Sequence, residues 1–130
     1  MSGRRALGIG EMARRTGRSV HTMRWYEAQG LVPGVARDAG GRRQYTERHV
    51  EWFALLGRLK ATGMPLAEIR RYAGLIASGR PGIPAQVDLL RAHREKVVQQ
   101  MEEMAEALAL IDAKLADYKA WSLTGKRPGR

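Results

Sequence analysis

Residues 9–29 read IGEMARRTGRSVHTMRWYEAQ, and the fold of the N-terminal half follows from this stretch. Apolar residues recur at helical spacing in its first part, at Ile9, Met12 and Ala13. Gly17 predicts the end of that helix, because a tight turn favours a residue that tolerates a positive φ. Ser19 is expected to cap a second helix over residues 19–29, with Val20 and Met23 pointing back to the core. Two short helices joined by such a turn form a helix-turn-helix.

The outward face of the second helix is the candidate recognition surface. Because each helical residue turns about 100°, we expect His21, Thr22 and Trp25 to face outward, and Arg24 and Tyr26 to lie on the flanks. Small polar side chains near a helix N-terminus suit the base edges of a major groove, and flanking residues can reach phosphates. The alternative is a solvated polar face with Trp25 and Tyr26 packed in the core.

The segment after this helix predicts a basic hairpin. Residues 35–37 and 42–45 indicate two short strands about a glycine-containing turn. A hairpin beside a helix-turn-helix is a wing, and its Arg37, Arg42 and Arg43 are expected to follow the phosphate backbone or reach the minor groove. The alternative is a solvated surface hairpin, which three clustered arginines disfavour.

Two further helices are predicted before residue 80. Thr46 is the expected N-cap of the first, Gly63 its end, and Pro65 the start of the second. Their buried stripes are expected at Val50, Phe53, Ala54 and Gly57, and at Leu66, Ile69 and Ala73. Two aromatic residues are expected in the core or an interface rather than around a ligand, namely Trp52 and Tyr72. Arg58 and Lys60 either add phosphate contacts or form a solvated face.

The C-terminal part carries a heptad pattern. Apolar or aromatic residues, with one exception, repeat at alternating spacings of four and three: Ile83, Val87, Leu90, Arg94, Val97, Met101, Met104, Leu108, Ile111, Leu115 and Tyr118. A helix this long cannot bury the seam on its own head, so a second copy in a coiled coil is expected to cover it. The exception, Arg94, either specifies register or extends past the edge of the seam.

Composition limits the class of function. Lys and Arg number 23 against 13 Asp and Glu, a formal net charge of +10, which predicts a polyanionic partner such as nucleic acid or an anionic membrane surface. No run approaches the roughly 18 apolar residues of a membrane span, and Met1–Gly10 has no apolar block of the signal-peptide kind, so we expect a cytosolic protein. The lack of cysteine excludes disulfides, thiolate metal sites and iron–sulfur clusters.

Catalysis finds little support in the sequence. His21, His49 and His93 have no partner at metal-ligand spacing, and no glycine-rich phosphate loop follows a buried strand. We therefore expect no enzyme, no metal and no cofactor.

The motifs together resemble those of the MerR family of transcriptional regulators. The resemblance is carried over residues 8–77 by IGEMA at 9–13, TMRWYE at 22–27 with Gly30-Leu31, the run from Gly41 to Tyr45, and TGMPL at 62–66 with Glu68-Ile69. It implies a winged helix-turn-helix head, an antiparallel coiled-coil homodimer, and a pseudo-palindromic promoter operator that is bent and untwisted for RNA polymerase. It assigns Thr22, Arg24 and Tyr26 to the recognition helix, and Arg37, Arg43 and Tyr45 to the wing.

Three positions depart from the family pattern. Trp25 stands where Tyr or Phe is usual, Arg42 replaces the usual wing Tyr, and Pro65 replaces a capping Ser or Thr. The tail is similar to that of the small thiol- and aldehyde-stress subgroup, but Arg58 stands at the place of its reactive cysteine. An effector pocket at the head–tail junction or dimer interface would draw on Met64, Tyr72, Trp121, Met101 and Met104, for which core packing is the alternative.

The sequence thus predicts a mainly α protein with a winged head at residues 1–80, a dimerisation helix at 81–121 and a flexible tail at 122–130. The expected function is a sequence-specific, DNA-distorting transcriptional regulator at the nucleoid, with double-stranded DNA, a second copy and RNA polymerase as partners, no membrane, and an effector not identified. The alternative is a dimeric non-specific or architectural nucleic-acid-binding protein. Predicted DNA contacts are Ser19, His21, Thr22, Arg24, Trp25, Tyr26, Arg37, Gly41, Arg42, Arg43, Tyr45 and Lys60. Predicted dimer contacts are Val87, Leu90, Val97, Met101, Met104, Leu108, Ile111 and Leu115.

Overall fold

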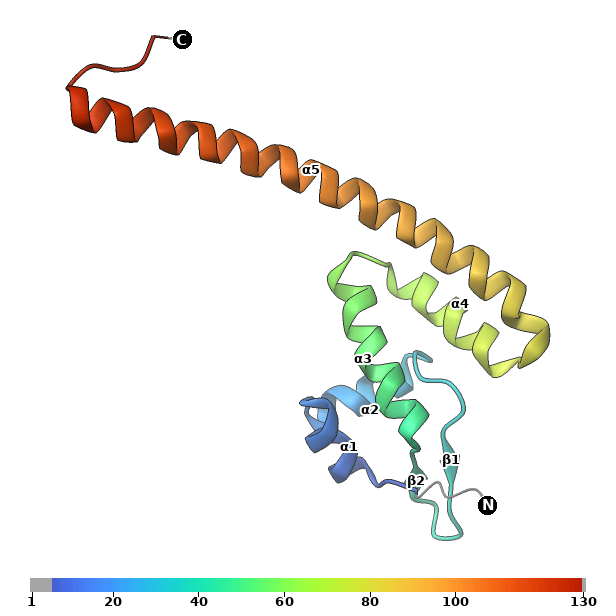
Figure 1. The fold of residues 1–130 in the computed structure, drawn as a ribbon. Helices are drawn as coiled ribbons and strands as arrows, with labels where there is room; N and C mark the ends of the chain where they lie inside the picture. Colours follow the sequence, from blue (N-terminus) through green and yellow to red (C-terminus); the bar gives the residue numbers. More distant parts are fainter. Residues whose placement is uncertain (1–5, 130) are drawn as a thin grey trace. The chain divides into compact units, whose positions relative to one another are not determined.

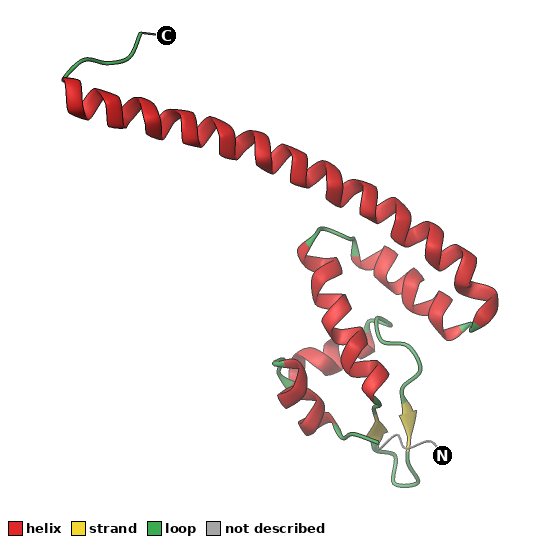
Figure 2. Cartoon of the chain, viewed as in Figure 1, coloured by secondary structure: helices red, strands yellow, loops and turns green. Residues whose placement is uncertain are grey.

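The computed structural model describes residues 6–129 and is mainly α-helical, as predicted. Its elements are α1 (Ile9–Thr16), α2 (Val20–Ala28), β1 (Ala36–Arg37), β2 (Arg43–Gln44), α3 (Glu47–Ala61), α4 (Leu66–Ala77), a 3₁₀ turn (Arg80–Gly82) and α5 (Ile83–Thr124) (Figures 1 and 2). The chain divides into two compact units after Leu90. Residues 1–5, part of the segment used to exclude a signal peptide, and Arg130 of the predicted tail lie outside the described residues.

The first unit begins with the predicted helix-turn-helix. Gly17 adopts a left-handed conformation with φ 71° and ends α1, and Ser19 caps α2 by accepting a hydrogen bond from the Thr22 amide at 3.0 Å. Met12 and Met23, one from each helix, are fully buried. The end of α1, the start of α2, Met12 and Met23 are therefore where the sequence pattern indicated, whereas Val20, also expected to face the core, is only half-buried.

The wing is a two-stranded antiparallel hairpin, shorter than predicted, in which Arg37 pairs with Arg43. Its turn is organised by Asp38, whose Oδ1 accepts hydrogen bonds from the amides of Gly40 and Arg42, each at 2.9 Å. The hydrogen bond from the Arg42 amide is the main reason that the pKa of Asp38 lies below its ordinary value. Tyr45 continues the hairpin by pairing with Leu7 before α1, so the wing is anchored to the start of the head.

Helix α3 forms the centre of the core and is rotated relative to the prediction. Its fully or nearly buried apolar residues are Trp52, Phe53, Leu56 and Leu59. The prediction that Ala54 faces the core is wrong, because its side chain is exposed, and Val50 and Gly57 are only half-buried. Helix α3 contacts both α1 and α4, so it buries a wider arc than one stripe.

The predicted core roles of the two aromatic residues on α3 and α4 are confirmed. Trp52 and Tyr72 are each 6% exposed, and their ring centroids lie 5.3 Å apart. The indole Nε1 of Trp52 donates to the carbonyl of Leu31 at 2.8 Å, which ties α3 to the segment after α2.

The joint between α4 and α5 is a close backbone contact. A Cβ at Gly82 would overlap the carbonyl oxygen of Leu75 and the hydroxyl of Ser78, so only glycine fits there without movement. Beyond this joint Leu89 is buried in the core and Leu90 packs against it. The first turns of α5 thus belong to the first unit, which explains why the unit boundary falls at Leu90 rather than at residue 80.

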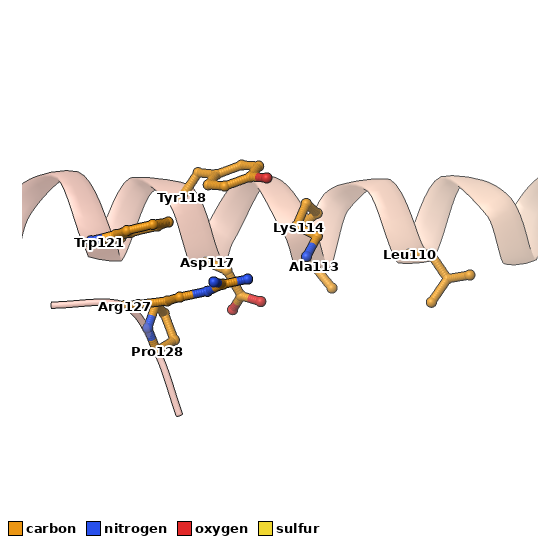
Figure 3. A pocket seen from close by; sticks show the side chains of 8 residues that line it. All are labelled: Leu110, Ala113, Lys114, Asp117, Tyr118, Trp121, Arg127 and Pro128. Carbon is orange, nitrogen blue, oxygen red and sulfur yellow. The ribbon is translucent and has the colours of Figure 1, made fainter. Parts of the chain in front are cut away.

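The second unit is helical from residue 91 to Thr124, three residues beyond the predicted end of the dimerisation helix. The predicted seam residues on it are largely exposed, including Met101, Met104, Leu108, Ile111 and Leu115. Gly125, with φ 70°, ends the helix. The following segment turns back beside it, so that Arg127 lies 5.4 Å from the Trp121 ring, in a hollow also lined by Asp117 and Tyr118 (Figure 3).

The five residues of the expected effector pocket do not share a pocket in either unit. Met64 is buried in the core, Tyr72 lines a pocket of the first unit, and Trp121 lines the separate hollow of the second unit. Met101 and Met104 are exposed on α5.

Candidate nucleic-acid interface

The outer face of α2 presents polar and aromatic side chains to solvent. His21, Arg24 and Trp25 are exposed, and Thr22 is half-exposed, as the helical period predicted. The hydroxyl of Ser19 donates to the Thr22 hydroxyl at 2.9 Å, which orients both groups at the N-terminus of the helix. The core-packing alternative for Trp25 is wrong, since 41% of its side chain surface is accessible.

Tyr26 is buried rather than placed on the exposed flank. It is 4% exposed because it follows Met23 by three residues and shares that buried side of α2. The ammonium of Lys60 donates to the Tyr26 hydroxyl at 2.9 Å and lies 4.8 Å from the ring centroid, while the Arg18 guanidinium lies 5.6 Å from it. Tyr26 therefore holds two cations in place, and Lys60 itself remains exposed.

Glu27 joins the recognition helix to the wing. One of its carboxylate oxygens accepts from Arg43 Nε, and the other accepts from the Tyr45 hydroxyl at 2.9 Å. Tyr45 is 1% exposed, and burial, followed by the hydrogen bond to Glu27, raises its pKa to about 12. Arg43 and Tyr45 thus fix β2 against α2 through Glu27, and a direct contact of either side chain with DNA stays a prediction.

Sequence reasoning assigned no role to Glu27. A usable signal was present, because Glu27 follows the core residue Met23 by four positions and therefore lies on the inner side of α2. An inward carboxylate in a stretch with nine basic and three acidic residues, 1–45, calls for a cationic partner.

Two arginines remain as unpaired cations between helix and wing. A hollow of about 220 Å³ is bounded by the start of α1, by Arg24 and by the wing tip, including Arg42. Within residues 6–129 neither guanidinium makes a hydrogen bond or ion pair. The α1 N-terminus adds partial positive charge, since its N-cap, Gly8, offers no side chain to the first amides.

The remaining wing residues support its turn. The guanidinium of Arg37 donates to the Gly41 carbonyl at 2.8 Å, so Arg37 braces the turn from the opposite strand. Gly41 has φ 81°, a conformation that other residues rarely adopt. The wing tip therefore presents Arg42 with its backbone already ordered.

The described chain offers no metal cluster and no membrane span. Across residues 6–129, no three His, Asp or Glu side chains are grouped so that they could hold a metal ion. None of the helices described is long and apolar enough to cross a bilayer.

Comparisons with known proteins agree with this geometry. Residues 7–74 match the family model of the MerR HTH family regulatory protein, and residues 50–114 match the model named MerR, DNA binding. An uncharacterised HTH-type transcriptional regulator of Haemophilus influenzae is 36% identical over 107 residues, which cover 82% of this chain and 79% of that protein.

Two solved structures are similar to this chain over most of its length. HiNmlR, a MerR family regulator lacking the sensor domain and bound to promoter DNA, has 33% identity and a TM-score of 0.80, covering 94% of this chain and 97% of that one. A putative MerR family transcriptional regulator from Listeria monocytogenes has 26% identity and a TM-score of 0.84, covering 92% and 90%.

Proposed function

Because this chain belongs to the MerR family of DNA-binding transcriptional regulators, we propose that it binds promoter DNA as a homodimer and distorts that DNA to control transcription initiation. The observation that carries the proposal is the cationic, solvent-facing side of α2 with Arg24 and Trp25 exposed beside the unpaired Arg42 of the wing. Its support from outside the chain is HiNmlR, a relative bound to promoter DNA.

In this proposal α2 enters the major groove. Its N-terminal residues Ser19, His21 and Thr22 face the base edges, and Trp25 packs against the sugar–phosphate wall. The hollow beside Arg24 and Arg42 takes a backbone phosphate, which the uncapped α1 N-terminus also favours.

The remaining residues predicted to contact DNA hold other side chains in place. Arg37 and Gly41 hold the wing turn, and Tyr45 and Arg43 hold β2 through Glu27. Tyr26 orients Lys60 toward the DNA-facing side of the head. These residues affect DNA binding through the placement of Arg24, Arg42 and Lys60.

Dimerisation is proposed from the apolar stripe of α5. From residue 91 to Thr124 the helix spans about 51 Å at 1.5 Å per residue, and its seam residues are mostly more than half exposed in the single chain. Soluble monomers rarely expose a long contiguous apolar stripe, and a heptad repeat is typically covered by another helix of the same kind. The second copy then supplies the second head for a pseudo-palindromic operator.

The test is selection of genomic fragments bound by the purified protein, followed by footprinting with RNA polymerase present. A regulator binds its selected site at least about a thousandfold more tightly than random DNA at physiological salt. Arg24→Ala should weaken binding, whereas Arg71→Ala, which removes an exposed arginine of α4, is the matched control. Equal affinity for all sequences with a steep salt dependence would instead identify a non-specific binder.

A further inference from the structure

A second cavity of the first unit shares no lining residue with the hollow at Arg24 and Arg42. Its volume is about 590 Å³, within the range of about 300–1,000 Å³ typical of small-molecule sites. Apolar side chains from three segments form most of its wall, among them Pro33, Trp52, Leu55 and Ile76.

Tyr72 is a buried residue of this cavity whose hydroxyl has no partner. The residue lines the cavity and is 6% exposed, and its hydroxyl makes no hydrogen bond within residues 6–129. No buried side-chain nitrogen or oxygen lacks a partner among these residues, so the hydroxyl lies in the small part of Tyr72 that solvent reaches. A phenol in an apolar wall offers one O–H donor to an acceptor entering the cavity.

The other buried polar side chains of the wall, those of His49 and Trp52, are already engaged. His49 accepts the Thr46 amide at Nδ1, at 3.0 Å, and its Nε2 lies 2.9 Å from the Pro33 carbonyl, which requires that Nε2 donate. The Trp52 indole donates to a backbone carbonyl. Among the buried side chains of the wall, Tyr72 is therefore the one whose donor remains for a ligand.

Two charged residues at the edge of the cavity influence which ligand charge it favours. Arg48 and Glu51 both line it and both are exposed. The guanidinium of Arg48 favours an anionic group, and the carboxylate of Glu51, which lines the same cavity, disfavours a ligand with several negative charges. An apolar body with one carboxylate satisfies the walls, the Tyr72 hydroxyl and the charged edge together.

We propose that this cavity is an effector site for a small aromatic or branched apolar carboxylic acid. Its walls include Pro33 and Thr46, which flank the wing on either side, and His49 links these two segments. A ligand seated there changes the position of the wing relative to α2, and so changes DNA affinity. This regulatory role rests on the proposed DNA-binding function, whereas ligand binding itself does not.

The experiment titrates the DNA-free protein with para-tert-butylbenzoate. The chain has three tryptophans, so a Trp25→Phe/Trp121→Phe background leaves Trp52, in the cavity wall, as the sole reporter. We expect saturable quenching, and calorimetry on the unaltered protein should give the same affinity. Tyr72→Phe should weaken binding by about three- to tenfold with an unchanged melting temperature, because it removes a single unpartnered hydroxyl. Arg48→Gln should also weaken binding, and the matched Arg71→Gln should not.

Three results would overturn the proposal. One is the absence of saturable binding to the folded protein. Another is an affinity in both the Tyr72→Phe and the Arg48→Gln variant that equals the affinity of the unaltered protein, which would place the ligand elsewhere. The third is binding that disappears as the chain dimerises, which would make a second copy the occupant. Promoter binding is measured separately without ligand, so its failure would count against the proposed function alone.

Discussion

Replacing Glu27 by Gln tests whether the wing is positioned by the recognition helix. The change keeps the shape of the side chain and an acceptor for Tyr45, but removes the negative charge that pairs with Arg43. The two partners are 17% and 31% exposed, between a surface pair worth about 0.5 kcal/mol and a buried pair whose disruption costs about 3 kcal/mol. After discounting for solvent screening we expect a loss of about 1–2 kcal/mol of unfolding free energy.

The effect on DNA binding has a diagnostic sign. Removing a carboxylate from a DNA-binding head strengthens non-specific attraction to phosphates, so a purely electrostatic role predicts tighter binding. A positioning role predicts the opposite for the specific site, because the wing with Arg42 becomes loosely placed. We expect specific affinity to fall by about three- to tenfold, which corresponds to about 0.7–1.4 kcal/mol, while non-specific affinity stays the same or rises.

The assay compares fluorescence anisotropy on the selected operator and on random DNA at one salt concentration, together with thermal unfolding. Glu106→Gln, at an exposed position of α5 outside the seam, makes the same charge change. It should leave the affinities for the operator and for random DNA unaltered. Equal tightening on both DNAs with an unchanged melting temperature would refute the positioning role of Glu27.

Gly82→Ala should lower the unfolding free energy by at least about 2 kcal/mol in denaturant melts, because the new Cβ overlaps a backbone carbonyl of α4. Gly74→Ala, with open space around it, should instead raise the unfolding free energy by about 0.5–1 kcal/mol. Equal effects of the two substitutions would contradict the close contact at Gly82. Leu108→Asp should yield monomers by sedimentation, while Leu110→Asp, at an even more exposed position outside the seam, should leave the dimer intact. A dimer in both variants would reject the seam. Because folding raises the pKa of Tyr45 to about 12, its contribution to stability is complete below pH about 10 and is lost as the pH rises through about 12. Denaturant melts across that range should therefore show a decline that Tyr45→Phe reduces, and an identical decline in both proteins would disprove it.

Local features were predictable because they depend on neighbours within about one helical turn. Gly17 and Gly63 end helices through their own backbone freedom, and Ser19 caps α2 by reaching an amide three residues away. The heptad spacing of α5 likewise marks its apolar stripe from sequence alone, since the period is a property of the helix itself.

The orientation of each element depended on contacts between distant residues. Ala54 was misplaced because the buried arc of α3 is set by α1 and α4 together, and a single stripe cannot reveal two neighbours. The pairing of Glu27 with Arg43 joins residues 16 apart, and Lys60 reaches Tyr26 across 34 residues. Such pairs form only when packing of the core brings α2, the wing and α3 together, so the pattern of residue types shows which charges need partners but not which partners they find.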